Sequence, residues 1–203
     1  MMKSTYYRIL VLCLAVGPSL AHADAFDKIK STLSEAACVR VEFLSILESK
    51  IFKEVDTSNG TADLARDGKY VVTVGTDQYL CDRTNLYTYS RENNQVVIEG
   101  VDSSATFGKE VSYLMHMDDL FTTRIVKPDL EYQLIKRSPR MPNLPDTIVV
   151  IIDKEKLRLV SLSYNDINDE PTRIEFLRLT SSDKCDERKF EPNFPDSVER
   201  VKL

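Results

Sequence analysis

Apolar positions recur with helical spacing at the start of the region that follows residue 23. Phe26, Ile29 and Leu33 are three or four residues apart, which predicts a short amphipathic helix over 24–37. The pattern then changes, because apolar and polar residues alternate over 39–43, the period of a strand with one buried face. The folded part of the chain therefore begins with a helix that leads directly into a β-sheet.

Short alternating segments continue along most of the remaining chain. We expect strands at 39–43, 61–65, 69–74, 78–82, 86–90, 95–99, 132–136, 147–152, 159–164, 173–180 and 188–192. Asn59-Gly60 is a frequent two-residue turn sequence, so we expect a hairpin turn at that position. Segments that follow one another this closely favour antiparallel pairs, since parallel pairs need long crossover connections.

The alternation is interrupted once, near the middle of the chain. Val111, Leu114 and Leu120 are spaced as on one face of a helix, which predicts a second helix over about 109–121. No repeat, linker or change of composition divides the strands into two groups. The prediction is a single mainly β (α+β) domain of about eleven antiparallel strands in one curved sheet, with helices on one face.

Residues 1–23 have the features of a secretory signal peptide. Lys3 and Arg8 form a positive n-region, the apolar run 9–16 follows, and Ala21-His22-Ala23 is a small-x-small cleavage site. The apolar run is shorter than the roughly 20 residues that a membrane-spanning helix needs. We expect cleavage after Ala23, export to the periplasm, and a mature domain of residues 24–203.

Composition and charge narrow the classes of function. Hydrophobic residues make up 42% and charged residues 29% of the chain, with six glycines and eight prolines, which is typical of a globular domain. The net charge is −5, and loss of Lys3 and Arg8 with the signal peptide takes it to −7. An acidic protein lacks the basic face that a nucleic-acid binder needs, so we expect no nucleic-acid partner.

Three cysteines remain after the signal peptide: Cys38, Cys81 and Cys185. Disulfides are chemically allowed in an exported protein, and an odd number of cysteines permits at most one internal bridge. The sequence does not choose among the three pairings, and small buried thiols without any bridge fit it equally well. No two cysteines form a CxxC pair, so neither a zinc site nor a thioredoxin-type motif is indicated.

The chain offers little catalytic chemistry. His116 is the only histidine after residue 23, and its neighbours Met115 and Met117 would point in different directions on a helix, so the three do not face one metal ion. The sequence has no nucleophile elbow, zinc-protease motif, phosphate loop or EF-hand. We therefore expect no catalytic residue, no metal and no cofactor. Two carboxylates brought together from distant strands are the remaining route to an enzyme.

Three segments resemble the LolA family of periplasmic outer-membrane lipoprotein carriers. In 60–70, the residues that fit the family pattern are Gly60, Leu64, Arg66 and Tyr70, and Asp67 stands in place of a proline. In 81–89, the residues that fit are Asp82, Leu86 and Tyr89, while Tyr87 stands for a tryptophan and Arg83 for a glycine. Phe190 and 194–198 resemble the family's ending. The order and spacing of these segments extend the resemblance over nearly the whole mature chain.

The resemblance implies an incomplete β-barrel whose concave face is covered by helices, with an apolar cavity that takes up the acyl chains of lipoproteins. It also implies a monomeric carrier without a cofactor, and two partners: an inner-membrane ABC-type lipoprotein releasing complex and an outer-membrane receptor. In the family an arginine holds the helical lid shut through hydrogen bonds to main-chain groups, and Arg66 matches that arginine. An exposed arginine at a strand end is the alternative interpretation of Arg66.

Bulky apolar residues of the predicted strands and helix are the candidates for the cavity lining. They are Phe43, Leu64, Val72, Leu86, Ile148, Val150, Leu162 and Phe176 from the strands, and Leu114, Met115 and Phe121 from the helix. Ordinary core packing is the alternative for each of them. Met115 is the most suggestive, because a flexible thioether adapts to varied ligands.

These observations predict a carrier that binds the acyl chains of lipoproteins or related lipids and shuttles them from the inner to the outer membrane. A lipid-binding periplasmic sensor, or a carrier of another lipid, would have the same fold. A hydrolase of envelope polymers would instead place two carboxylates across a cleft. A structural adaptor would have a filled core without a cavity.

Overall fold

One open sheet forms the body of the protein. The computed structural model describes residues 24–101, 111–139, 144–166 and 169–203, so the predicted signal peptide lies outside the described residues. The strands are β1 (Cys38–Ser49), β2 (Glu54–Ala65), β3 (Tyr70–Val74), β4 (Asp77–Cys81), β5 (Asn85–Ser90), β6 (Gln95–Gly100), β7 (Phe121–Lys127), β8 (Glu131–Lys136), β9 (Thr147–Asp153), β10 (Arg158–Asn165), β11 (Pro171–Ser182) and β12 (Glu199–Lys202). They form a 12-stranded sheet in the order β12-β6-β5-β4-β3-β2-β1-β11-β10-β9-β8-β7.

The three longest strands, β2, β1 and β11, lie side by side in the middle of this sheet. Strands β1 to β6 form a meander on one side of β1, and β7 to β11 form a second meander that returns to pair with β1 through β11. All pairs are antiparallel except β12, which adds to β6 in parallel. Within the described ranges no ladder joins the edge strands β7 and β12, so the sheet stays open. The predicted mainly β fold, an incomplete barrel with helices, is confirmed.

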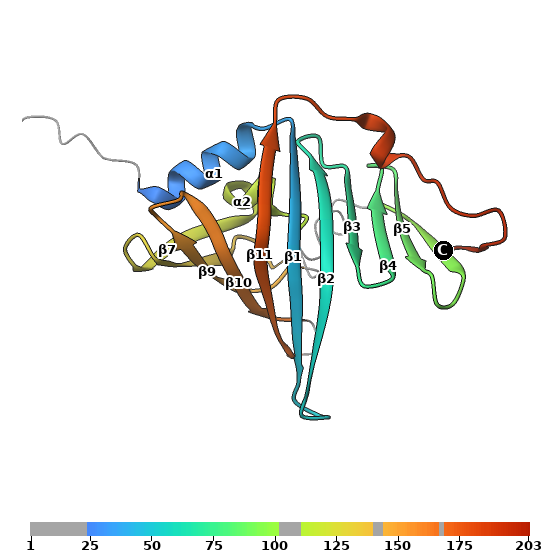
Figure 1. Ribbon diagram of the computed structural model, residues 1–203, viewed down its shortest axis with the longest axis horizontal. Coiled ribbons are helices and arrows are strands. Elements are labelled where there is room, and N and C mark those ends of the chain that lie inside the picture. Colours follow the sequence, from blue (N-terminus) through green and yellow to red (C-terminus); the bar gives the residue numbers. More distant parts are fainter. Residues whose placement is uncertain (1–23, 102–110, 140–143, 167–168) are drawn as a thin grey trace, which may run out of the picture.

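Two short helical segments cover one end of the concave face. Helix α1 (Ala25–Glu35) begins at Asp24, whose Oδ1 accepts a hydrogen bond from the Asp27 N–H at 2.8 Å. Its apolar stripe packs toward the sheet, and the Phe26 ring lies 4.6 Å from the Tyr132 ring of β8. The 3₁₀ turn η1 (Leu114–His116) and helix α2 (Met117–Leu120) lie beneath α1, at the end of the sheet where β1 begins (Figure 1).

The second predicted helix is much shorter than expected. Of the range 109–121, residues 109–110 lie outside the described residues, and only 114–120 is helical. Phe121 already begins β7, a strand that the helical spacing concealed. The β-branched run that follows Phe121 favours extended backbone, and this local preference was stronger than the apparent period.

The turn predicted at Asn59-Gly60 is wrong. Gly60 lies inside β2, directly opposite Phe43 of β1, and the two strands are instead connected by Lys50–Lys53. A Cβ added at Gly60 would collide with the ring of Phe43, which is fully buried. Glycine therefore provides space for an aromatic ring on the concave face, and it does not make a turn here.

The C-terminal segment wraps around the opposite face of the sheet. The predicted strand 188–192 is largely a 3₁₀ turn, η2 (Glu187–Phe190), and the chain then reaches the far edge as β12. Phe194 and Val198 pack against Leu80, Tyr87 and Val96 in a second, smaller apolar cluster. By strand register these residues of β4 to β6 point away from the concave face, so the segment covers the outside of that half of the sheet.

Candidate functional site

The concave face divides into two regions of opposite character. The closed region lies beneath α1, η1 and α2 and is filled by apolar side chains. The open region lies toward the β1–β2 hairpin and contains a cavity of about 1050 Å³. Both regions are built from the same strands, which pass from one into the other.

The closed region contains every lining candidate from the sequence. Each of these side chains is at most 7% exposed, and all belong to a single core cluster: Phe43, Leu64, Val72, Leu86, Leu114, Met115, Phe121, Ile148, Val150, Leu162 and Phe176. The ring of Tyr113 also packs edge-on against Phe121, with 5.6 Å between ring centroids. The structure thus brings the candidates together, but as a packed core under the helices.

The open region is lined by a different set of residues. Polar and apolar side chains are mixed in this lining: Ser45, Ile46, Leu47, Glu48, Asp56, Ser58, Val74, Tyr79, Tyr113, Lys136, Leu144, Pro145, Asp146, Thr147, Val149, Ser163, Tyr164, Asn165, Asp166, Asp169, Pro171, Thr172 and Arg173. None of the candidates named from the sequence borders this cavity. Bulk apolar character identified the filled part of the concave face, whereas the space lies where polar residues are mixed with apolar ones.

Strand register locates the boundary between the regions. Val41 of β1 is fully buried opposite Ala62, Phe43 lies over Gly60, and Ser45 then faces Ser58 at the cavity. These positions of β1 share one face, because alternate residues of a strand point to the same side. Within four residues the same face therefore changes from a dry core to an open, polar surface.

Lys30 connects the lid helix α1 to the segment beneath it. Its ammonium lies 2.6 Å from Asp118 Oδ1 and 3.1 Å from Asp27 Oδ1, and it donates a hydrogen bond to Thr123 Oγ1 at 3.3 Å. Burial alone would lower the pKa of Lys30, but the hydrogen bonds to Asp118 and Asp27 outweigh it and raise the pKa above its ordinary value. The side chain of Lys30 is only 9% exposed, while that of Asp118 is 65% exposed. The contacts of Lys30 with Asp27, Asp118 and Thr123, called the charged lock below, therefore attach α1 to α2 and β7.

Sequence reasoning missed Lys30 as a functional residue, although the sequence carries a signal. Lys30 falls within the apolar stripe of α1, between Ile29 and Leu33, at a position where a charge must have a partner. One partner, Asp27, is local, but Asp118 is 88 positions further along the chain, so no local pattern could name it.

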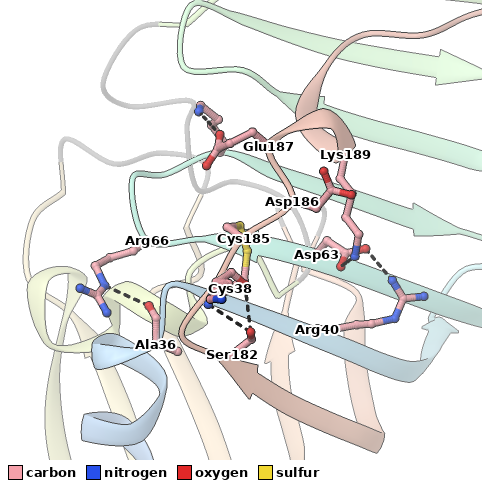
Figure 2. The surroundings of a disulfide bond; sticks show 12 residues. Ala36, Cys38, Arg40, Asp63, Arg66, Ser182, Cys185, Asp186, Glu187 and Lys189 are labelled. Atoms are coloured by element: carbon pink, nitrogen blue, oxygen red, sulfur yellow. Dashed lines mark hydrogen bonds and ion pairs between the residues drawn. A yellow bond between two sulfur atoms is a disulfide. The ribbon is translucent and has the colours of Figure 1, made fainter.

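Arg66 contacts the main chain at the C-terminal end of helix α1. Its Nε donates a hydrogen bond to the carbonyl of Ala36 at 2.9 Å, and its backbone N–H donates to the carbonyl of Ala37 at 3.1 Å. Both acceptors follow the last turn of α1, where carbonyl groups have no partner within the helix. Arg66 thus contacts main-chain groups at the junction between lid and sheet (Figure 2).

A disulfide joins this junction to the C-terminal segment. Cys38 and Cys185, 147 positions apart, form the bridge, with a Cα–Cα distance of 5.2 Å, and Cys81 is a buried free thiol. The bond lies beside Arg66 and Ala36, and the N–H of Ala37 donates to the carbonyl of Ser182 at 2.9 Å (Figure 2). One of the three pairings that the sequence left open is therefore formed. A disulfide is typical of an exported protein.

Asp82 and Arg83 form the turn between β4 and β5, although Arg83 stands where the pattern of the resemblance has a glycine. Asp82 accepts hydrogen bonds from the N–H groups of Thr84 and Asn85 at 2.8 and 2.7 Å and from the Tyr87 hydroxyl at 3.0 Å. Burial alone would raise the pKa of Asp82, but these hydrogen bonds outweigh it and lower the pKa. Arg83 adopts φ +80°, the left-handed conformation that glycine takes at low cost.

Two carboxylates at the cavity are paired with lysines. Lys50 lies 2.9 Å from Asp169, and its ammonium, with the Asn165 amide, lowers the pKa of Asp169 below its ordinary value. Asp146 is paired with Lys136 at 2.6 Å. The acid in a glycosidase-type pair needs a raised pKa, so the shift of Asp169 is the opposite of what that role requires. Among the described residues, no three histidine, cysteine, aspartate or glutamate side chains gather as a metal site.

No protein-family model matches the sequence, and no curated protein matches it significantly. Solved structures do match the fold. An uncharacterized conserved protein from Thermus thermophilus is similar over 88% of this chain and 97% of its own, with a TM-score of 0.52 and 12% identity. At that identity the likeness shows the fold alone.

Two further structures are similar to this chain over most of its length. A LolA superfamily protein from Nitrosomonas europaea covers 84% of this chain and 99% of its own, with a TM-score of 0.47 and 7% identity. A domain assigned to an outer membrane lipoprotein-sorting protein from Vibrio parahaemolyticus covers 81% of this chain and 94% of its own, with a TM-score of 0.45 and 11% identity. An open sheet carries helices on its concave face, as the resemblance in the sequence implied.

Proposed function

We propose that the protein is a periplasmic carrier that binds the acyl chains of lipoproteins, or of related lipids, and shuttles them from the inner to the outer membrane. The observation that carries the proposal is the division of the concave face into a closed apolar region and an open cavity whose lining includes many polar groups. An amphiphile needs both, because its chain gains from apolar surroundings while its polar part stays hydrated.

Burial of acyl chains supplies the driving force for binding. Each methylene group that leaves water gains about 0.8 kcal/mol, so an acyl chain does not cross an aqueous compartment unprotected. In the closed region the lining candidates now cover one another, and a bound chain would replace those contacts. We propose Phe43, Leu64, Val72, Leu86, Ile148, Val150, Leu162 and Phe176 of the sheet, and Leu114, Met115 and Phe121 below α1, as the residues that contact the chain.

Entry of a chain into the closed region requires α1 to move. The lid is held by the buried side chains of Phe26, Ile29 and Leu33 and by polar contacts at Lys30 and Arg66. The polar contacts exchange with water at modest cost, and a bound acyl chain would replace apolar contacts that opening breaks, so the lid can open without unfolding the sheet. Arg66 and Lys30 are the residues that we propose control this opening.

The route and the partners follow from the family resemblance. We propose that residues 1–23 direct export and are removed, that an inner-membrane ABC-type lipoprotein releasing complex loads the protein, and that an outer-membrane receptor unloads it. The Cys38–Cys185 disulfide supports an oxidising compartment. A carrier of this kind is a monomer that performs no chemical step and needs no cofactor or metal.

Native mass spectrometry of the protein purified from the envelope fraction tests the proposal. We expect a bound acylated species that is released when the protein unfolds and whose mass identifies the cargo after lipid extraction. An unliganded mass, together with no uptake of an added acylated lipopeptide, would contradict the carrier function.

A further inference from the structure

The tip of the β1–β2 hairpin exposes the largest apolar side chains at this end of the molecule. Ile51 is 78% exposed, Phe52 is 74% exposed, and Val55 at the start of β2 is 64% exposed. The hairpin extends beyond its neighbours, because β3 pairs with β2 only from Gly60 to Leu64. Figure 1 shows the tip projecting from the end of the sheet opposite α1. Adjacent bulky apolar residues in such a position indicate a contact surface.

Hydrogen bonds hold the tip in a defined conformation. The N–H of Lys53 donates to the carbonyl of Ser49 at 2.9 Å, and the N–H of Phe52 donates to Ser49 Oγ at 3.3 Å. Ser49 Oγ in turn donates to Glu170 Oε1 at 3.0 Å, and Lys50 pairs with Asp169, so the turn before β11 supports the hairpin. The apolar pair is thus presented in a preorganised form, which lowers the entropy cost of binding.

The size, shape and charge of the tip favour a lipid bilayer over a protein partner. Three side chains offer roughly 400 Å² between them, about half of what one partner contributes to a standard protein interface. They stand at a convex end without surrounding walls, and insertion into a bilayer requires no complementary surface. Residues 48–55 contain two lysines and two glutamates, so their net charge is zero and apolar contact must provide the binding.

The hairpin also forms part of the cavity wall. Leu47, Glu48 and Asp56 belong to the same two strands and line the open region. A membrane that holds Ile51 and Phe52 would therefore meet the protein next to the cavity and far from the lid helix. We infer that the β1–β2 hairpin tip inserts into the surface of a phospholipid bilayer and so brings the open region to the membrane. This docking does not depend on the proposed function, although a carrier of acyl chains would have a reason to bring its cavity to a membrane.

A single tryptophan at the tip tests this inference. The chain contains no tryptophan, so Phe52→Trp introduces the only one and keeps an aromatic side chain at the tip. With vesicles of phosphatidylethanolamine and phosphatidylglycerol in a ratio of about 3:1, mixing a neutral and an anionic headgroup, we expect a blue shift of its emission and quenching by brominated acyl chains. The matched control is Leu157→Trp, which replaces a 51% exposed leucine between β9 and β10, at the opposite end of the sheet. We expect no shift for it.

Vesicle sedimentation measures what the apolar pair contributes. Ile51→Ser/Phe52→Ser should lower the vesicle partition coefficient at least tenfold, and Leu130→Ser/Leu157→Ser should change it less than twofold. Because the tip has no net charge, raising the salt concentration should also change binding less than twofold. Equal blue shifts at the two tryptophan positions, or no vesicle binding by the wild type, would overturn the inference.

Uptake of an acylated probe in the absence of vesicles separates this inference from the proposed function. Ile51→Ser/Phe52→Ser should take up the probe like the wild type, because neither side chain lines the cavity. Failure of the wild type to take up the probe would contradict the carrier function and leave the vesicle result to decide the docking.

Discussion

The closed and open regions differ although the same strands build them. Strand β1 contributes the fully buried Val41 and Phe43 to one region and the cavity-lining Ser45 to the other, on one face and at two-residue steps. The difference arises from what lies above the strand: helices and rings cover the first region, whereas the second borders an open cavity with a mixed polar and apolar lining. A hydrophobic core and an open cavity are therefore two stretches of one surface.

The comparison also shows how a core can remain accessible. In the part of the chain that the structure describes, no strand closes the barrel over the closed region, and the helix that covers it is attached through Lys30 and Arg66. Its apolar packing stabilises the protein, and under the proposed function the same surface would become available to an acyl chain once α1 moves. Substitutions in the core, in the lid and at the cavity should therefore differ in their effects.

A carboxylate introduced into each region should give the largest difference in stability between the two regions. Val41→Asp would bury a carboxylate without a partner, and we expect it to lower the free energy of unfolding by about 4 kcal/mol or more. Ser45→Asp, on the same face of β1, should cost less than about 1 kcal/mol because water reaches the cavity. Denaturant unfolding of both variants measures the difference, and similar losses would contradict the division into regions.

Removal of the charged lock should loosen the lid with a smaller loss of stability. Lys30→Met keeps an apolar stem but loses the hydrogen bonds to Asp118 and Asp27, so we expect about 2 kcal/mol lower stability and faster uptake of an acylated fluorescent probe. Lys28→Met, on the exposed face of α1, is the control and should change neither quantity. Unchanged uptake by Lys30→Met would show that Lys30 does not control the opening of α1.

The same lock predicts a dependence on alkaline pH. Because the pKa of Lys30 is raised in the folded protein, its contribution to stability is complete below the unfolded value of 10.5 and is lost as pH rises through the folded pKa. Wild-type stability should therefore fall more steeply above pH 10.5 than that of Lys30→Met. Parallel curves would show that this lysine does not carry the effect.

Arg66 should affect release of the ligand more than folding. Arg66→Leu removes one hydrogen bond to the Ala36 carbonyl at a partly exposed site, and we expect a loss of about 1 kcal/mol with a several-fold change in the release rate of the probe. Arg40→Leu is the control, since Arg40 pairs with Asp63 on the neighbouring strand and does not contact the lid. Equal release rates for wild type and Arg66→Leu would leave this arginine with a structural role only.

A change outside both regions should alter stability without altering binding. Arg83→Gly removes a side chain from a backbone at φ +80°, and we expect about 1 kcal/mol of added stability, because the left-handed conformation costs about 1–2 kcal/mol for a residue with a Cβ. Thermal unfolding with and without the probe would test this. A changed probe affinity would show that the regions are coupled through the β4–β5 turn.

Periodicity predicted the architecture because burial on one face leaves a direct trace in the sequence. The alternation at Val39, Val41 and Phe43 and the helical spacing from Phe26 to Leu33 correspond to β1 and α1. Local signals failed where a contact with a residue distant in the sequence determines the structure. Asn59-Gly60 is a common turn sequence, but Gly60 lies in a strand, where it leaves space for the ring of Phe43. In the same way, β12 was not predicted because its place is fixed by pairing with β6.

The site was harder to predict than the fold. Apolar bulk selected the filled part of the concave face, and none of those residues borders the cavity. The cavity begins where Ser45, Ser58 and Thr172 continue the same rows, and short polar residues in a sequence resemble ordinary surface. Lys30 needed a partner that only tertiary structure supplies. Arg66 could be proposed because its motif is local to one turn.

Photocrosslinking with a lipopeptide labelled at either end would locate both parts of the ligand on the concave face. With a diazirine at the end of the acyl chain, we predict adducts on peptides that carry Phe43, Leu162 and Phe176. With the diazirine beside the polar part, we predict adducts near Ser58 and Thr172. Acyl-end adducts confined to the open region, with none on the closed region, would contradict entry of the chain beneath the lid.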